Sequence, residues 1–144
     1  NQLINSEISS LPPSNNLEVT INDKFIFAKN SFDQWSLIYL VEQNYKEILK
    51  FISNVNLKDE ILASDYSYGQ VYFEINGKNK KEFLNKLTNF DLRLKKFPFS
   101  VMAQTLIARI DCSIYHLEDK YLLTCNKSFE DYFKNRLQDT SNLS

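Results

Sequence analysis

Short stretches of apolar and polar residues in the first half of the chain follow the patterns of β-strands. Leu17–Ile21 alternates apolar and polar positions, which is typical of a half-buried strand, and residues 25–27 form a second short strand. Residues 35–41 are apolar almost throughout, so we expect a third, central strand there. Apolar residues then recur at helical spacing and predict a helix over about 44–54. The apolar stripe of this helix consists of Tyr45, Ile48, Leu49 and Ile52.

The middle of the chain predicts two strands and a helix. Residues 61–63 are apolar, and the polar segment Asp65–Gln70 after them predicts a turn. Residues 71–75 form the next strand, which ends at Asn76-Gly77, and a helix opens near Lys78. That helix is expected to bury Phe83, Leu84 and Leu87 and to expose Lys80, Lys81, Glu82 and Lys86.

The last third predicts three strands, of which two form a hairpin. A strand covers about 103–110, and a turn follows near Asp111. Two strands then flank residues 118–120. If Glu118-Asp119 is the hairpin loop, Ile114 faces Leu123 and Cys112 faces Cys125 on one face of the sheet.

A final helix is predicted over about 127–138. Ser128 and Asp131 have the S-x-x-D spacing of a capping box, in which each side chain bonds a backbone amide of the first turn. Its buried stripe is expected to consist of Phe129, Tyr132, Phe133 and Leu137.

The order of elements is therefore β-β-β-α-β followed by β-α-β-β-β-α. It predicts an α+β fold of antiparallel sheets with a few packed helices. The two halves look like loose copies, although no sequence repeat is detectable. We expect a flexible lead-in over 1–16, a single α+β domain over 17–139 and a flexible tail over 140–144.

Composition and charge exclude several functional classes. Hydrophobic residues make up 43% of the chain, which is enough for a core, and the net charge is −1. Basic and acidic residues alternate without an obviously basic face, so nucleic acid is not an expected partner. No apolar run approaches the length that spans a membrane, and no signal peptide is visible. The two cysteines, without metal-ligand spacing, are read as reduced, buried thiols of a cytoplasmic protein.

Few residues have the pattern of a catalytic or ligand site. His116 is the only histidine, and it is read as an ordinary strand-end residue because a triad or zinc site needs partner residues. The Asp65–Gln70 segment is either a tight turn or a ligand site at a strand end, and the turn is favoured. Asn76-Gly77 is too short to be a phosphate-binding loop, so the lysines after it are read as a solvated helix face.

Aromatic and polar residues of two segments are candidates for a subunit interface. Trp35 is either a core anchor or a subunit contact. Phe97, Pro98 and Phe99 place two aromatic rings around a rigid residue, which fits either a binding hot spot or local core packing. A strand interior does not need Gln104 and Arg109, so these are expected to fix the 97–102 loop or to meet another subunit. The candidate interface is Trp35, Phe97, Pro98, Phe99, Gln104 and Arg109.

Several motifs resemble the gamma subunit of heterotetrameric sarcosine oxidase. The main one is Phe97-Pro98 followed by Ala103-Gln104-Thr105-Leu106-Ile107-Ala108-Arg109. Ser128–Tyr132, Leu87–Leu92 and the D-x-W-x-L segment that begins at Asp33 support it in the same order along the chain. The resemblance implies an architecture like that of the folate-binding domain of the glycine cleavage T-protein.

The resemblance also implies partners and a function. It implies a non-catalytic structural subunit that assembles with alpha, beta and delta subunits. That complex oxidatively demethylates sarcosine to glycine, and it forms hydrogen peroxide and methylenetetrahydrofolate. FAD, FMN, NAD, zinc and tetrahydrofolate are then expected on the partner subunits and none on this chain. The alternative function is a free-standing folate-binding module akin to the T-protein domain, motivated by the shared fold and the Asp65–Gln70 turn.

Overall fold

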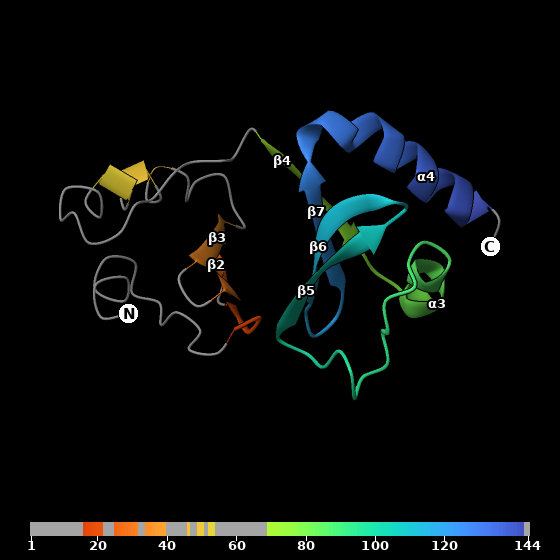
Figure 1. Cartoon of the computed structure of the whole chain (residues 1–144), viewed down its shortest axis with the longest axis horizontal. Helices are drawn as coiled ribbons and strands as arrows, with labels where there is room; N and C mark the ends of the chain where they lie inside the picture. Colours follow the sequence, from red (N-terminus) through yellow and green to blue (C-terminus); the bar gives the residue numbers. More distant parts are fainter. Residues whose placement is uncertain are drawn as a thin grey trace. The chain divides into compact units, whose positions relative to one another are not determined.

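The computed structural model describes the chain in two compact units, Asn1–Tyr66 and Ser67–Ser144. Figure 1 shows the elements of each unit. The described residues are 16–21, 25–31, 34–39, 46, 49–50, 52–53 and 69–142. The predicted lead-in up to residue 15, the strand at 61–63 and most of the Asp65–Gln70 turn lie outside them.

The N-terminal unit contains a three-stranded antiparallel sheet. Its strands are β1 (Val19–Ile21), β2 (Phe25–Ser31) and β3 (Gln34–Tyr39), in the order β1-β2-β3. The prediction that the third strand is central was wrong for this sheet as described, because β2 lies between the other two. Residues Phe25–Ala28 of β2 are buried on both faces, whereas the side chains of β3 are half-buried or exposed.

The helix predicted over 44–54 is confirmed at its described residues, which are all helical. Leu49, which was expected in the buried stripe, is exposed.

The C-terminal unit has the predicted order β-α-β-β-β-α. Its four antiparallel strands pair in the order β4-β7-β6-β5, so β4 and β5 form the edges of the sheet. The α+β fold class with antiparallel sheets and few helices is thus confirmed. The elements are β4 (Gln70–Ile75), α3 (Lys80–Asn85), β5 (Val101–Ile107), β6 (Ile110–His116), β7 (Tyr121–Asn126), the 3-10 turn η2 (Lys127–Phe129) and α4 (Glu130–Asn142).

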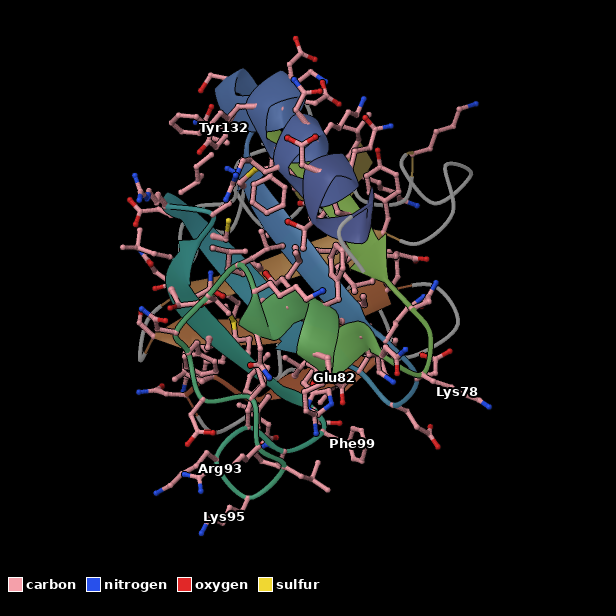
Figure 2. The ribbon with its side chains drawn as sticks, turned by 90° about the vertical axis from the view of Figure 1, so that its right-hand side faces the viewer. Lys78, Glu82, Arg93, Lys95, Phe99 and Tyr132 are labelled. Carbon is pink, nitrogen blue, oxygen red and sulfur yellow. The ribbon has the colours of Figure 1, made fainter. Side chains whose placement is uncertain are left out.

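One face of this sheet forms the core together with both helices. Leu84 of α3 and Phe133 of α4 are fully buried against Ile114 and Leu123, which are direct cross-strand neighbours. The Phe133 ring also stacks on Phe73 of β4, with 5.1 Å between the ring centres. Each large apolar side chain buried here stabilises the fold by roughly 1.5–3 kcal/mol. Figure 2 shows both helices in front of the sheet, with α4 above α3.

The β6–β7 hairpin has the predicted register. Ile114 pairs with Leu123, and the Leu117 N–H donates to the Lys120 carbonyl at 2.9 Å. The strand predicted over 103–110 was wrong at its end, because β5 stops at Ile107 and the turn consists of Ala108-Arg109. Both turn residues have positive φ, 52° and 68°, as a two-residue type I′ turn requires. No residue pattern marks this turn, because type I′ turns usually contain Asn-Gly.

The start of the last helix differs from the prediction. Asn126, not Ser128, caps the chain as it enters η2, because its Oδ1 accepts from the Ser128 N–H at 2.9 Å and the Ser128 hydroxyl at 2.8 Å. Phe133 and the half-buried Leu137 contact the core as predicted, but Phe129 and Tyr132 are 44% and 47% exposed. The helix reaches Asn142, so the residues from 140 to 142 are helical rather than part of a flexible tail.

Candidate functional site

The loop Phe97–Ser100, between α3 and β5, combines a buried aromatic residue with an exposed one. Phe97 is 1% exposed and belongs to the core, where the Phe90 ring meets it edge-on with 5.1 Å between ring centres. Phe99, two residues later, is 49% exposed, and Pro98 and Ser100 beside it are also exposed. The loop therefore uses Phe97 as an anchor and presents Phe99 to the outside (Figure 2).

His116 fixes this loop from the end of β6. Its Nδ1 lies 2.7 Å from the Phe97 carbonyl oxygen, and because a carbonyl only accepts, Nδ1 carries the proton. In return the Ser100 N–H donates to the His116 carbonyl at 2.8 Å. Burial lowers the pKa of His116, and the positive charges of Lys81 and Lys80 lower it further, against the opposing effect of the Phe97 carbonyl. The imidazole is thus held neutral as a structural donor, which agrees with the strand-end reading.

Aromatic rings surround His116 on several sides. The Tyr121 ring stacks on the imidazole at 4.6 Å between ring centres, and the Phe99 ring leans on it at 4.6 Å. Tyr121 is fully buried, which raises the pKa of its phenol, and its hydroxyl meets no hydrogen-bond partner among the described residues. Tyr121 therefore serves the loop through its ring.

Hydrogen bonds attach the tip of the β5–β6 hairpin to the segment that follows α3 and to the first turn of α4. The Ala108 N–H donates to the Leu87 carbonyl at 2.8 Å, and the Thr88 hydroxyl donates to the Leu106 carbonyl at 2.8 Å. The Tyr132 hydroxyl of α4 reaches the Ala108 carbonyl at 3.3 Å. Arg109 is exposed at this tip. The unusual backbone of the turn is thus held by tertiary hydrogen bonds.

The six candidate interface residues occupy different environments. Trp35 is half-buried in β3 of the N-terminal unit, where the Lys29 ammonium lies 5.3 Å from its ring centre. Phe97 is a core residue, so of the aromatic pair only Phe99 offers its ring at the surface. Gln104, on the edge strand β5, is exposed like Arg109. The interface role of these residues stays a prediction.

The two cysteines lie side by side on the core face of the sheet. Cys112 and Cys125 directly adjoin Ser113 and Thr124, the last pair of the β6–β7 register, and both are buried. Burial is the main cause that raises the pKa of Cys112 to about 12, and it raises the pKa of Cys125 as well. Both thiols are therefore protonated at neutral pH and are poor nucleophiles.

No three His, Cys, Asp or Glu side chains among the described residues gather as metal ligands would. No described helix has the length and apolar character needed to cross a membrane. Gly77 before α3 has a φ of 108°, a backbone conformation that residues other than glycine rarely adopt, so it serves the turn there.

Comparison with known protein families identifies the family of this chain. The sequence pattern of the sarcosine oxidase gamma subunit family matches residues 16–143. The chain belongs to that family. The match covers the described strands and helices of both units, and it includes the Phe99 loop and His116.

A solved structure of a heterotetrameric sarcosine oxidase also resembles this member of the gamma subunit family. The protein comes from Corynebacterium sp. U-96 and was determined in complex with pyrrole 2-carboxylate. The TM-score is 0.79 at 16% sequence identity, over 96% of this chain and 71% of that one. At this identity the similarity shows a shared fold. No curated protein matches the chain.

Sequence reasoning missed a group of basic residues around the loop of this family member. Lys80 and Lys81 of α3 are close enough to His116 to act on its pKa, and Lys95 and Lys96 are exposed in the turn that leads to Phe97. The helical periodicity of α3 predicts that its lysines face solvent. It carries no information about whether they lie near the Phe97–Ser100 loop, which follows later in the sequence. A count of basic and acidic residues along the sequence is the signal that could have revealed this basic group.

Proposed function

We propose that this chain is a non-catalytic structural subunit of a heterotetrameric sarcosine oxidase. The observation that carries the proposal is the family match over residues 16–143. The shared fold with a chain of a heterotetrameric sarcosine oxidase supports it. The partners are then alpha, beta and delta subunits.

The reaction of the complex follows from this assignment. It oxidatively demethylates sarcosine to glycine, with oxygen as acceptor, and forms hydrogen peroxide and, with tetrahydrofolate, methylenetetrahydrofolate. FAD, FMN, NAD and tetrahydrofolate belong to the larger partner subunits, and zinc belongs to the delta subunit.

The structural role of this chain is supported by how its reactive side chains are used. The Nδ1 proton of His116 is engaged by the Phe97 carbonyl, and aromatic rings pack on the imidazole. The two thiols are buried beside each other and remain protonated. These groups hold the loop and the sheet together, which is the work of structural residues.

Co-expression tests the proposal. The chain should co-elute with the alpha, beta and delta subunits encoded near it when the mixture is resolved by size-exclusion chromatography at moderate salt. A complex that carries Cys125→Ala should keep the sarcosine turnover number of the wild type within about twofold, since the thiol takes no part in chemistry. Two results contradict the proposal: failure of the wild type to co-elute, or saturable binding of tetrahydrofolate by the chain alone.

A further inference from the structure

The exposed Phe99 ring is held in place before any partner binds. Pro98 restricts the backbone on one side, and Ser100 on the other has a φ of 64°, which few residues other than glycine adopt. The Ser100 N–H is bonded to His116, whose ring supports the Phe99 ring at 4.6 Å. A side chain fixed in this way loses little freedom on binding, which favours its use as an anchor.

Basic side chains lie at the same end of the C-terminal unit as this ring. Lys95 and Lys96 are exposed in the turn closed by the Phe97 N–H and the Arg93 carbonyl at 2.8 Å. Figure 2 shows Arg93, Lys95 and Phe99 at the same end of the C-terminal unit, below α3. We call this the Phe99 surface, and it consists of Lys80, Lys81, Leu94, Lys95, Lys96 and Phe99.

The segment from residue 78 to 96 contains two acidic residues, Glu82 and Asp91. Asp91 forms a bidentate ion pair with Arg93, with a shortest distance of 2.7 Å, and so neutralises that residue. Glu82 of α3 is exposed, and Figure 2 shows it above Phe99 in that view. The four lysines of the Phe99 surface thus outnumber the acidic residues of this segment.

The charge of this region contrasts with that of the whole chain. Between residues 78 and 96 there are seven basic and two acidic residues, whereas the chain has 17 basic and 18 acidic residues. The remainder is therefore acidic, and the positive charge is concentrated where Phe99 and Leu94 are 49% and 48% exposed.

We propose that the Phe99 surface binds an acidic segment of a partner subunit, which places an apolar side chain against the Phe99 ring. The inference rests on the proposed function and names the contact surface within it. Charge complementarity selects the acidic partner and steers its approach, and the fixed ring provides the apolar contact. A protein fits better than RNA because Leu94 is aliphatic and offers no stacking surface for a base.

Two variants of the full-length chain test this contact in the co-expressed complex. Phe99→Ala should weaken binding of the partner subunits about tenfold or more, as loss of an aromatic hot spot does. Lys95→Glu combined with Lys96→Glu should slow association about tenfold at low salt, and the difference should shrink as salt screens the charges. Both effects are measured by immobilising the wild-type or variant chain and recording association and dissociation of the partner subunits.

Matched controls carry the same changes elsewhere. Phe129→Ala removes an aromatic side chain that is similarly exposed, and Lys134→Glu with Arg136→Glu reverses two charges on α4. Both controls should bind as the wild type does. Circular dichroism of each variant checks that its secondary structure is unchanged.

The possible outcomes separate this inference from the function it rests on. If the wild type does not bind partner subunits, the proposed function fails and the inference fails with it. If the wild type binds and both Phe99-surface variants bind equally well, the inference alone is overturned. The same holds if these lysine changes abolish binding of a single-stranded RNA probe and leave subunit binding intact.

Discussion

At the scale of single residues, the two phenylalanines around Pro98 have different structural roles because their tertiary contacts differ. Phe97 fills the core and its carbonyl receives the His116 proton, whereas Phe99 lies at the surface. No sequence pattern distinguishes them, because both stand in one short loop. The difference arises when His116, 19 residues later, binds the loop at Phe97.

The two side chains should therefore differ in their effect on stability. Phe97→Ala should lower the free energy of unfolding by about 3–5 kcal/mol, because it leaves a cavity in the core. Phe99→Ala should lower it by less than about 1 kcal/mol, since much of that ring is already in water. Urea unfolding followed by circular dichroism measures both. Equal losses for the two variants would contradict this assignment of anchor and exposed residue.

His116 should make stability depend on pH in the mildly acidic range. Its pKa is lowered in the folded chain, so the unfolded chain binds a proton more readily. The stabilising effect of keeping His116 neutral should be fully present above the pKa of about 6.5 that histidine has in the unfolded chain. The free energy of unfolding should fall as the pH drops below that value. Unfolding free energies between pH 7.5 and 5 test this, and His116→Gln should remove most of the fall.

A carboxylate variant separates this effect from acid titration. The ion pair with Arg93 holds the pKa of Asp91 at about 2 in the folded chain, so its contribution is lost only below the ordinary carboxylate range. Asp91→Asn should therefore leave the pH dependence between 7.5 and 5 unchanged. A loss of that dependence in Asp91→Asn would argue against His116 as its source.

At the scale of elements, the strand and helix types followed from the pattern of apolar positions, and the turns did not. The β6–β7 register was predictable because a two-residue loop fixes which side chains face each other. The β5–β6 turn was missed because Ala108 and Arg109 lack the residues that favour positive φ. Hydrogen bonds stabilise it instead: the Leu87 carbonyl accepts from Ala108, and the Thr88 and Tyr132 hydroxyls donate to carbonyls of the hairpin tip.

A substitution that removes the backbone strain of this turn should stabilise the chain. Arg109 is exposed and has a φ of 68°, a conformation that costs ordinary residues about 1–2 kcal/mol and glycine almost nothing. After the entropy that glycine loses on folding, Arg109→Gly should raise the free energy of unfolding by about 0.5–1 kcal/mol. Ser113→Gly, in the middle of β6, is the control and should lower it. Destabilisation by both changes would contradict the type I′ assignment.

The cysteine pair provides a chemical test of the β6–β7 register. Because Leu117 and Lys120 are a hydrogen-bonded pair, alternation makes Cys112 and Cys125 a non-hydrogen-bonded pair, whose side chains lie close together. Both thiols are buried and protonated, so alkylation by iodoacetamide at pH 8 should be at least about tenfold slower in the folded chain than in urea. Fast alkylation of the folded chain would show that the thiols are accessible.

At the scale of the whole molecule, charge distribution is the property that the linear sequence conceals most. A net charge of −1 argues against polyanion binding when charge is taken as an average. The packing of α3 brings Lys80 and Lys81 near His116, and the Arg93–Phe97 turn holds Lys95 and Lys96 shortly before Phe99. An acidic protein segment is the partner that this surface fits. The fold, in turn, is shared with a sarcosine oxidase chain that is only 16% identical.

The sequence by itself determined the element order of the C-terminal unit, the hairpin register and the family. These depend on local periodicity, on one short loop and on motifs read in order along the chain. Only the tertiary structure decided which side chain of Phe97-Pro98-Phe99 is buried, where the β5–β6 turn falls and which lysines lie near His116. Each depends on contacts between residues distant in sequence, and local patterns carry no information about such contacts.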